Sequence, residues 1–242
     1  MNFTLPSTTA FATLPLVWLV ATIAAFQIGA LLNRMSGGLP IVNPVLIAMA
    51  LLIGALLVTN VDYATYLREG GGLVGAILGP ATVALAVPLY NNARHVARTM
   101  VPIICAVLVG GATAAGTAFG LAWLLGAPDA VLRSIAVKSV TAPIAIGVSE
   151  QIGGVASLAA AFAVLTGVTG TVIATYLLDR AGVSCWHARG LAMGVTAHGQ
   201  GTARMLALNE TGGAFSSVGM GLNAFFTAIW LPAFIAIVSL WW

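Results

Sequence analysis

Five long apolar segments, almost free of charge, direct this chain into a lipid bilayer. They lie at roughly 13–33, 40–60, 101–125, 156–178 and 214–241. As an α-helix, each is long enough to cross a hydrocarbon core of about 30 Å. Only 6% of the residues are charged, whereas a soluble domain carries about 25% charged residues. The sequence therefore predicts an all-α integral membrane protein, built as a polytopic helix bundle.

The same pattern disfavours several other classes of protein. An outer-membrane barrel would show alternating segments of about ten residues instead of long apolar runs. The net charge of +3 is small and scattered, so we expect no nucleic-acid partner. Cys105 and Cys185 lack the spacing of a metal site or a disulfide framework. The sequence has no nucleophile elbow, phosphate-binding loop or paired-carboxylate pattern, so we expect no enzyme, no metal and no cofactor.

Three further stretches are helical in length but are interrupted by Gly, Pro or polar residues: 72–92, 130–150 and 190–208. Non-helical backbone at membrane depth survives only where protein or a water-filled cavity satisfies its polar groups. Interrupted segments in corresponding positions also indicate the binding site of a transporter. We therefore expect a transporter-like bundle with interrupted or re-entrant helices. Short strings shared between the three stretches are explained either by inverted repeats or by chance.

The placement of Lys and Arg orients the chain. The first fifteen residues contain neither, and Arg34 follows the first span, so we expect the N-terminus outside. If 130–150 crossed fully, the next span would deliver Arg180 and Arg189 outside, against the positive-inside tendency. If the stretch dips in and returns, both arginines fall inside. We favour the re-entrant or broken helix.

The run 138–143, Lys-Ser-Val-Thr-Ala-Pro, carries the most informative group of polar residues. Pro143 cannot donate a backbone hydrogen bond and disfavours helix at the residue before it, so a second half-helix can begin here. The exposed N–H groups at the start of that half-helix suit a carboxylate. Ser139 and Thr141 add hydroxyl donors, and Lys138 adds a positive charge. The alternative is a plain proline kink, with Lys138 reaching to the membrane interface.

A second polar group lies within 190–208. His198 can change its charge near physiological pH. Gly199 and Gly201 allow the backbone to approach a ligand closely. Thr202 and Arg204 offer hydrogen-bond donors. These residues are candidates for substrate binding, and the alternative is that His198 is a hydrogen-bonded packing residue.

Glu150 and two asparagines complete the candidates. A buried Glu150 suits a proton-coupling group or a partner for Lys138, whereas in a glycine turn it would be a loop residue at the interface. Asn91 and Asn92 close the stretch 72–92 and are candidates for substrate contact, although a helix terminus explains them as simply. Asn223 lies within the last span, where we expect it to form an interhelical hydrogen bond.

These motifs resemble the LrgB/CidB family of bacterial membrane proteins, and the membrane domain of the plastidal glycolate/glycerate translocator of plants. The resemblance is carried by Gly79-Pro80-Ala81-Thr82 through Tyr90, by Lys138 through Gly154, by His198-Gly199-x-Gly201-Thr202-Ala203 and by strings at 213–223. It covers most of the chain from about residue 40 onward. Gln200 and Ala142 depart from the family pattern, and both departures can alter the choice of substrate.

The resemblance implies one of two functions. The first is a carrier of small monocarboxylates or hydroxy acids, such as glycolate, glycerate or pyruvate, which works by alternating access. Glu150 or His198 would then carry a coupled proton. The second is a holin-like or antiholin-like regulator of murein hydrolase activity and cell lysis, acting with a small membrane partner of the LrgA/CidA type. A purely structural membrane subunit is a third class.

We favour the carrier, because a lysis pore needs oligomerisation and an amphipathic face rather than a proline-broken helix that bears a lysine. Residues 1–70 are then expected to form scaffold and oligomerisation spans, with a homodimer favoured. Residues 71–242 are expected to form an LrgB-type transport core. The resemblance places the protein in the bacterial cytoplasmic (inner) membrane, with a small organic anion and the lipid bilayer as its partners.

Overall fold

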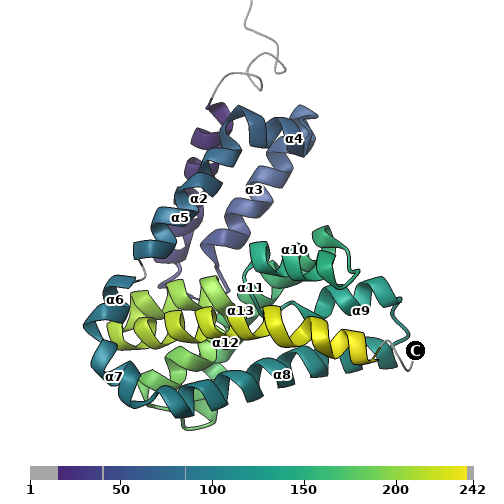
Figure 1. Cartoon of the computed structure of the whole chain (residues 1–242). Helices are drawn as coiled ribbons and strands as arrows, with labels where there is room; N and C mark the ends of the chain where they lie inside the picture. The colour runs from purple at the N-terminus through teal and green to yellow at the C-terminus, as the bar shows by residue number, and fades with distance from the viewer. Residues whose placement is uncertain (1–15, 40, 85, 239–242) are drawn as a thin grey trace, which may run out of the picture. The chain divides into compact units, whose positions relative to one another are not determined.

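The computed structural model describes residues 16–39, 41–84 and 86–238, and the regular elements in these ranges are helices (Figure 1). Four of these helices are long and apolar enough to cross a membrane, or up to five spans result if the bent pair Pro44–Thr59 and Tyr63–Ile77 counts as one. The predicted all-α membrane fold is confirmed. The chain divides into two compact units, Met1–Ala84 and Leu85–Trp242.

The first unit is built around a close pair of helices, α2 and α3. Its elements are α2 (Val17–Met35), α3 (Pro44–Thr59), α4 (Tyr63–Tyr66), the π-helical turn η1 (Leu67–Gly71) and α5 (Gly72–Ala84). Pro44 opens α3, where its missing N–H leaves no helical hydrogen bond unmade. Asn43 caps this helix by accepting a hydrogen bond from the Val45 N–H at 2.8 Å. A Cβ on Gly29 of α2 would meet the Pro44 carbonyl, so only glycine permits this close packing.

The second unit combines three long helices with shorter ones. Its elements are α6 (Ala86–Asn91), α7 (Ala93–Arg98), α8 (Met100–Leu124), α9 (Asp129–Ala136), α10 (Ala142–Gln151), α11 (Ala156–Arg180), α12 (Trp186–Leu208) and α13 (Glu210–Val238). The helices α8, α11 and α13 correspond to the predicted spans 101–125, 156–178 and 214–241. Ala159 and Ala163 of α11 and Ala224 of α13 belong to one hydrophobic core cluster, and small residues of this kind allow close packing of helices.

Helices α9 and α10 form a first hairpin. The chain leaves α9, passes through a short turn and enters α10 with Pro143 as its second residue. Two hydrogen bonds close the open end of this hairpin. Arg133 Nη1 donates to the Ile152 carbonyl at 2.8 Å, and the Val155 N–H donates to the Ser134 hydroxyl at 2.8 Å. The chain that follows α10 therefore lies beside α9. The prediction of a break within 130–150 is confirmed.

Helix α12 is a second hairpin, because it folds back on itself at His198. The backbone of His198 has φ 40° and ψ −122°, which is not helical. Beyond it the chain returns so closely that a Cβ on Gly201 would collide with the Met193 carbonyl oxygen. In a straight helix these two residues would lie about 12 Å apart along the axis. The prediction of an interrupted helix within 190–208 is confirmed, and the break is one residue wide.

The two hairpins open at opposite ends of α11. The first is joined to the start of α11 through the Val155 N–H described above. The second begins beside the end of α11, where Arg189 of α12 pairs with Asp179 at 2.6 Å. Helix α11 is long enough to cross the bilayer, and if it does so the two hairpins enter from opposite sides.

The tips of the hairpins meet within the second unit, near the middle of α11. Asn223 Nδ2 of α13 donates to the Ser139 carbonyl at 2.8 Å and to the Val195 carbonyl at 3.3 Å. His198 Nε2 lies 2.9 Å from the Ala163 carbonyl of α11. The non-helical backbone at both breaks is thus enclosed by protein, as the membrane interior requires.

The third interrupted stretch, 72–92, is described except at one residue. It contains α5 and α6, and residue 85 between these helices lies outside the described residues. The compact units also divide at this point. A functional division into a scaffold of residues 1–70 and a transport core of residues 71–242 stays a prediction.

Candidate functional site

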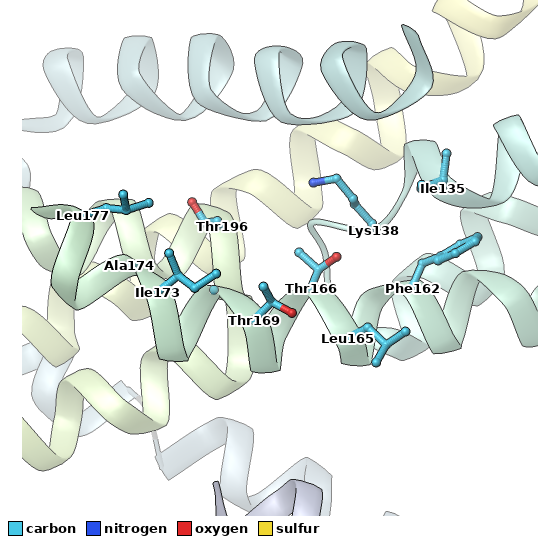
Figure 2. Close-up of a pocket in the computed structure, with 11 residues that line it drawn as sticks. Ile135, Lys138, Phe162, Leu165, Thr166, Thr169, Ile173, Ala174, Leu177 and Thr196 are labelled. Carbon is cyan, nitrogen blue, oxygen red and sulfur yellow. The ribbon is translucent and has the colours of Figure 1, made fainter. Parts of the chain in front are cut away.

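An open cavity of about 410 Å³ lies beside the tip of the first hairpin and along one side of α11. Figure 2 shows side chains from three elements facing this space. Its wall is formed by Ile135, Lys138, Phe162, Leu165, Thr166, Thr169, Gly170, Ile173, Ala174, Leu177 and Thr196. Most of these residues are apolar, so the few polar ones define what the cavity can bind.

Lys138 is the one charged side chain in this wall, and its charge is not neutralised within the described part of the chain. Its Nζ donates to the Ser139 hydroxyl at 3.1 Å. The ion pairs of the described residues involve arginines only. A cation without a counter-ion at membrane depth is costly, and such residues mark ion or substrate pathways. The cavity therefore suits an anion.

The depth of Lys138 follows from the length of the hairpin. Helix α9 has 8 residues, which gives about 12 Å at 1.5 Å per residue. A hairpin of this length that starts at the membrane surface would place its tip well inside a core of about 30 Å. Lys138 lines the cavity, and its place at membrane depth rather than at the interface stays a prediction.

Three threonines supply the remaining polar groups. Within the described chain, the hydroxyls of Thr166, Thr169 and Thr196 have no hydrogen-bond partner, although all three line the cavity. By contrast, the hydroxyl of Thr171 on α11 donates a hydrogen bond to the Gly167 carbonyl at 2.7 Å. The free hydroxyls can donate to a carboxylate or accept from a substrate hydroxyl.

The remaining predicted residues of the first tip hold the break rather than line the cavity. Thr141 precedes α10 as its N-cap residue, but its side chain makes no capping hydrogen bond. Pro143 lies one residue inside the helix, as predicted for the start of a second half-helix. Ser139 is buried. The predicted seat for a carboxylate on the α10 N-terminus stays a prediction.

The second predicted group serves the fold of α12. His198 is 5% exposed, and its Nε2 contacts the Ala163 carbonyl. Thr202 is buried and shares a hydrogen bond with Ser216 of α13 at 2.9 Å. Gly201 provides room for the returning backbone, because a Cβ there would meet the Met193 carbonyl, and its contact with a ligand stays a prediction. The alternative interpretation of a packing histidine fits these contacts.

Gly199 and Arg204 are not in the cavity wall either. A Cβ on Gly199 would meet no atom within 4 Å, so this position has free space beside it. Arg204 Nε is buried and has no hydrogen-bond partner among the described residues. Contact of either residue with a substrate stays a prediction.

Glu150 does not form the expected ion pair with Lys138. It is exposed near the end of α10, and α10 separates it from the tip by about 12 Å of helix. The buried pair across the hairpin is therefore a wrong expectation, while proton coupling by Glu150 or His198 stays untested. Among the described residues, no group of three or more His, Cys, Asp or Glu side chains could hold a metal ion.

Asn91 and Asn92 lie at the ends of short helices. Asn91 Nδ2 donates to Glu210 Oε1 at 3.0 Å, which joins α6 to the start of α13. Asn92 is the N-cap residue of α7. Neither residue lines the cavity, so the simpler interpretation as helix termini matches their positions.

Sequence reasoning missed the threonines of α11. The segment 156–178 reads as an ordinary apolar span, yet Thr166 and Thr169 stand three residues apart on one helical face. This pair of polar residues within a span was the feature of the sequence that could have indicated a cavity. It does not by itself predict one, because most threonines in apolar helices donate their hydroxyl hydrogen to the helix backbone.

Comparisons with known proteins agree with the resemblance seen in the motifs. The LrgB-like family model matches residues 22–237. The chain is 41% identical to the Bacillus subtilis protein YwbG over 192 residues, which is 78% of this chain and 84% of that relative.

Proteins named holin-like protein CidB are also similar. The one from Staphylococcus epidermidis is 34% identical and the one from Staphylococcus aureus 32% identical, each over 196 residues, or 81% of this chain and 85% of the relative. No solved structure matches the chain. The interrupted helices thus belong to a multi-pass membrane protein, and the chain is a member of the LrgB-like family.

Proposed function

We propose that this protein is a membrane carrier of small monocarboxylate anions, including hydroxy acids such as glycolate and glycerate, and pyruvate. The observation that carries the proposal is Lys138, an unpaired cation at a hairpin tip in the wall of a cavity. Its charge would balance the substrate carboxylate. The free hydroxyls of Thr166, Thr169 and Thr196 would bind the carboxylate and the substrate hydroxyl.

Alternating access is the mechanism that suits this site. The two hairpins enter from opposite sides and meet at the substrate position, so each could open the cavity toward its own side of the membrane. A bound anion neutralises Lys138 and lowers the electrostatic barrier to that movement. Coupling to a proton on Glu150 or His198 is part of the proposal and predicts that uptake depends on pH.

Counterflow in proteoliposomes tests the proposal. Vesicles preloaded with glycolate, glycerate or pyruvate should take up the labelled acid with saturable kinetics. Lys138→Ala should abolish this uptake, and Thr141→Val should reduce it strongly, while Lys138→Arg should retain part of it because the charge is kept. Normal uptake by Lys138→Ala in a folded protein would exclude the site from transport.

The names of two relatives favour a second candidate, a holin-like or antiholin-like regulator of cell lysis. This function would involve a small membrane partner of the LrgA/CidA type and control of murein hydrolases. It predicts dye leakage from vesicles, or altered autolysis of cells, without saturable uptake. Measuring counterflow and leakage on the same vesicles separates the two candidates.

We also propose an orientation and an assembly for the carrier. The helix that carries Arg94 and Arg98 contacts the opening of the α12 hairpin through the stacked rings of His95 and His187. At the same end, Arg189 pairs with Asp179, the residue before Arg180. This basic end would face the cytoplasm, with the N-terminus outside. The first spans would form a homodimer. Labelling of single engineered cysteines at the two ends of α11 in intact cells tests the orientation.

A further inference from the structure

We propose that Asn223 is a positioning residue that joins the two hairpin tips into a single unit. Asn223 lies on α13, is 2% exposed and does not line the cavity. It nevertheless contacts both breaks, because its Nδ2 donates to the Ser139 and Val195 carbonyls.

Both carbonyls lie at a helix break, where the regular i+4 donor is missing or follows a non-helical residue. In a continuous helix the Ser139 carbonyl would accept from residue 143, which is a proline and has no N–H. The Val195 carbonyl would accept from Gly199, which lies beyond the non-helical His198. A buried carbonyl without a partner is strongly unfavourable in a membrane. The amide group of Asn223 therefore donates hydrogen bonds to carbonyls at two breaks that lie far apart in the sequence.

The surroundings of Asn223 fix the position of this amide. On the side of α8, a Cβ on Gly111 would collide with Asn223 Oδ1, so glycine makes the space that the amide occupies. Ser139 also accepts a hydrogen bond from Lys138 Nζ at its hydroxyl. Thr196 directly follows Val195. Asn223 thus sets how the charged tip and the hydroxyl of the second tip lie relative to one another across the cavity.

Hydrogen exchange on the full-length protein in lipid nanodiscs tests the joint without any assumption about transport. In Asn223→Ala, amides in 137–142 and in 195–200 should both exchange about tenfold faster or more than in the wild type, because both carbonyls lose their donor. The matched control is Ser216→Ala, which removes the buried hydrogen bond to Thr202 but touches neither tip. It should leave 137–142 unchanged.

A second variant keeps the test valid if Asn223→Ala does not fold. Gly111→Ala retains the asparagine but displaces its amide, and it should speed exchange at the same two tips. Faster exchange at one tip only, or at neither, in a folded variant would overturn the proposal. The same two-tip pattern in Ser216→Ala would do so as well.

A transport measurement extends the inference to the cavity, and this part rests on the proposed function. Asn223→Ala should raise KM for the transported acid about tenfold, with a smaller change in maximal rate. Combined with Thr196→Val, the effect on KM should be less than the product of the two single effects, since both act through the same tip geometry. Multiplicative effects would assign Asn223 to folding alone.

The two failures can be distinguished. If the wild type takes up none of the acids, the carrier proposal fails, while the exchange experiment still decides whether Asn223 joins the tips. If uptake is saturable but the exchange pattern is absent, the carrier proposal stands and Asn223 is only a packing residue.

Discussion

Both hairpins reverse the direction of the chain within the bundle, but different residues break the helix in each. The first is broken by Pro143 and a short turn, its open end is closed by Arg133 and Ser134, and its tip points a lysine into the cavity. The second is broken at the single residue His198, and its halves pack backbone to backbone at Gly201.

The difference assigns the two tips different tasks. A wide break can present a side chain to a ligand, and Lys138 does so with its charge unpaired. A narrow break with tightly packed halves has little room for one, and the second tip offers the cavity only Thr196. In the proposed carrier, the first hairpin would supply the charge and the second hairpin mainly the shape of the cavity. Three substitution experiments test this contrast.

The largest effect is expected at Gly201 when it is compared with Gly199. Gly201→Ala places a methyl group against the Met193 carbonyl, whereas Gly199→Ala meets nothing within 4 Å. We expect the free energy of unfolding to fall by about 1–3 kcal/mol for Gly201→Ala and to change little for Gly199→Ala. Thermal unfolding in detergent measures both. Equal behaviour of the two variants would mean that the second hairpin is not tightly closed.

A smaller effect is expected from the cavity hydroxyls. Removing one by Thr166→Val or Thr196→Val should raise KM for glycolate about threefold to tenfold, the equivalent of one hydrogen bond worth roughly 0.5–1.5 kcal/mol. Thr171→Val is the matched control, because its hydroxyl is bound to the Gly167 carbonyl. Counterflow kinetics provide the readout. A similar rise in KM in all three variants would show that the free hydroxyls do not contribute more to binding than the bonded one.

The smallest effect concerns pH at the open ends of the hairpins. At the second hairpin, the rings of His187 and His95 stack with centroids 4.4 Å apart. Burial and then the neighbouring His95 lower the pKa of His187. A lowered pKa means that the folded state binds the proton less well, so stability is lost as pH falls below the ordinary value of about 6.5.

The first hairpin provides the comparison for this effect. Its closure by Arg133 involves a group that stays charged at every accessible pH. Between pH 7.5 and 5.5, we therefore expect hydrogen exchange to rise modestly at 186–190 and to stay constant at 150–155. His187→Gln should remove the pH dependence. An equal rise at both open ends would contradict the assignment to the histidine pair.

The features that could be predicted from the sequence are those that depend on local chemistry. Apolar length fixed the spans that became α8, α11 and α13, because a bilayer accepts only helices that satisfy their own backbone. Pro143 located the first break, since proline lacks an N–H wherever it stands. Lys138 could also be singled out from the sequence, because a charged residue in an apolar chain is recognisable without the structure.

Which polar groups are free of internal partners depends on the packing of the helices and could not be predicted from the sequence. Thr202 and His198 seemed suited to a ligand, and the fold gives each of them a hydrogen-bond partner within the protein, Ser216 and the Ala163 carbonyl. The hydroxyl of Thr166 was left free although its segment looked ordinary. Asn223 gained its role from two carbonyls that lie far away in the sequence. Whether a polar group is satisfied depends on partners brought by the fold, and no local pattern specifies them.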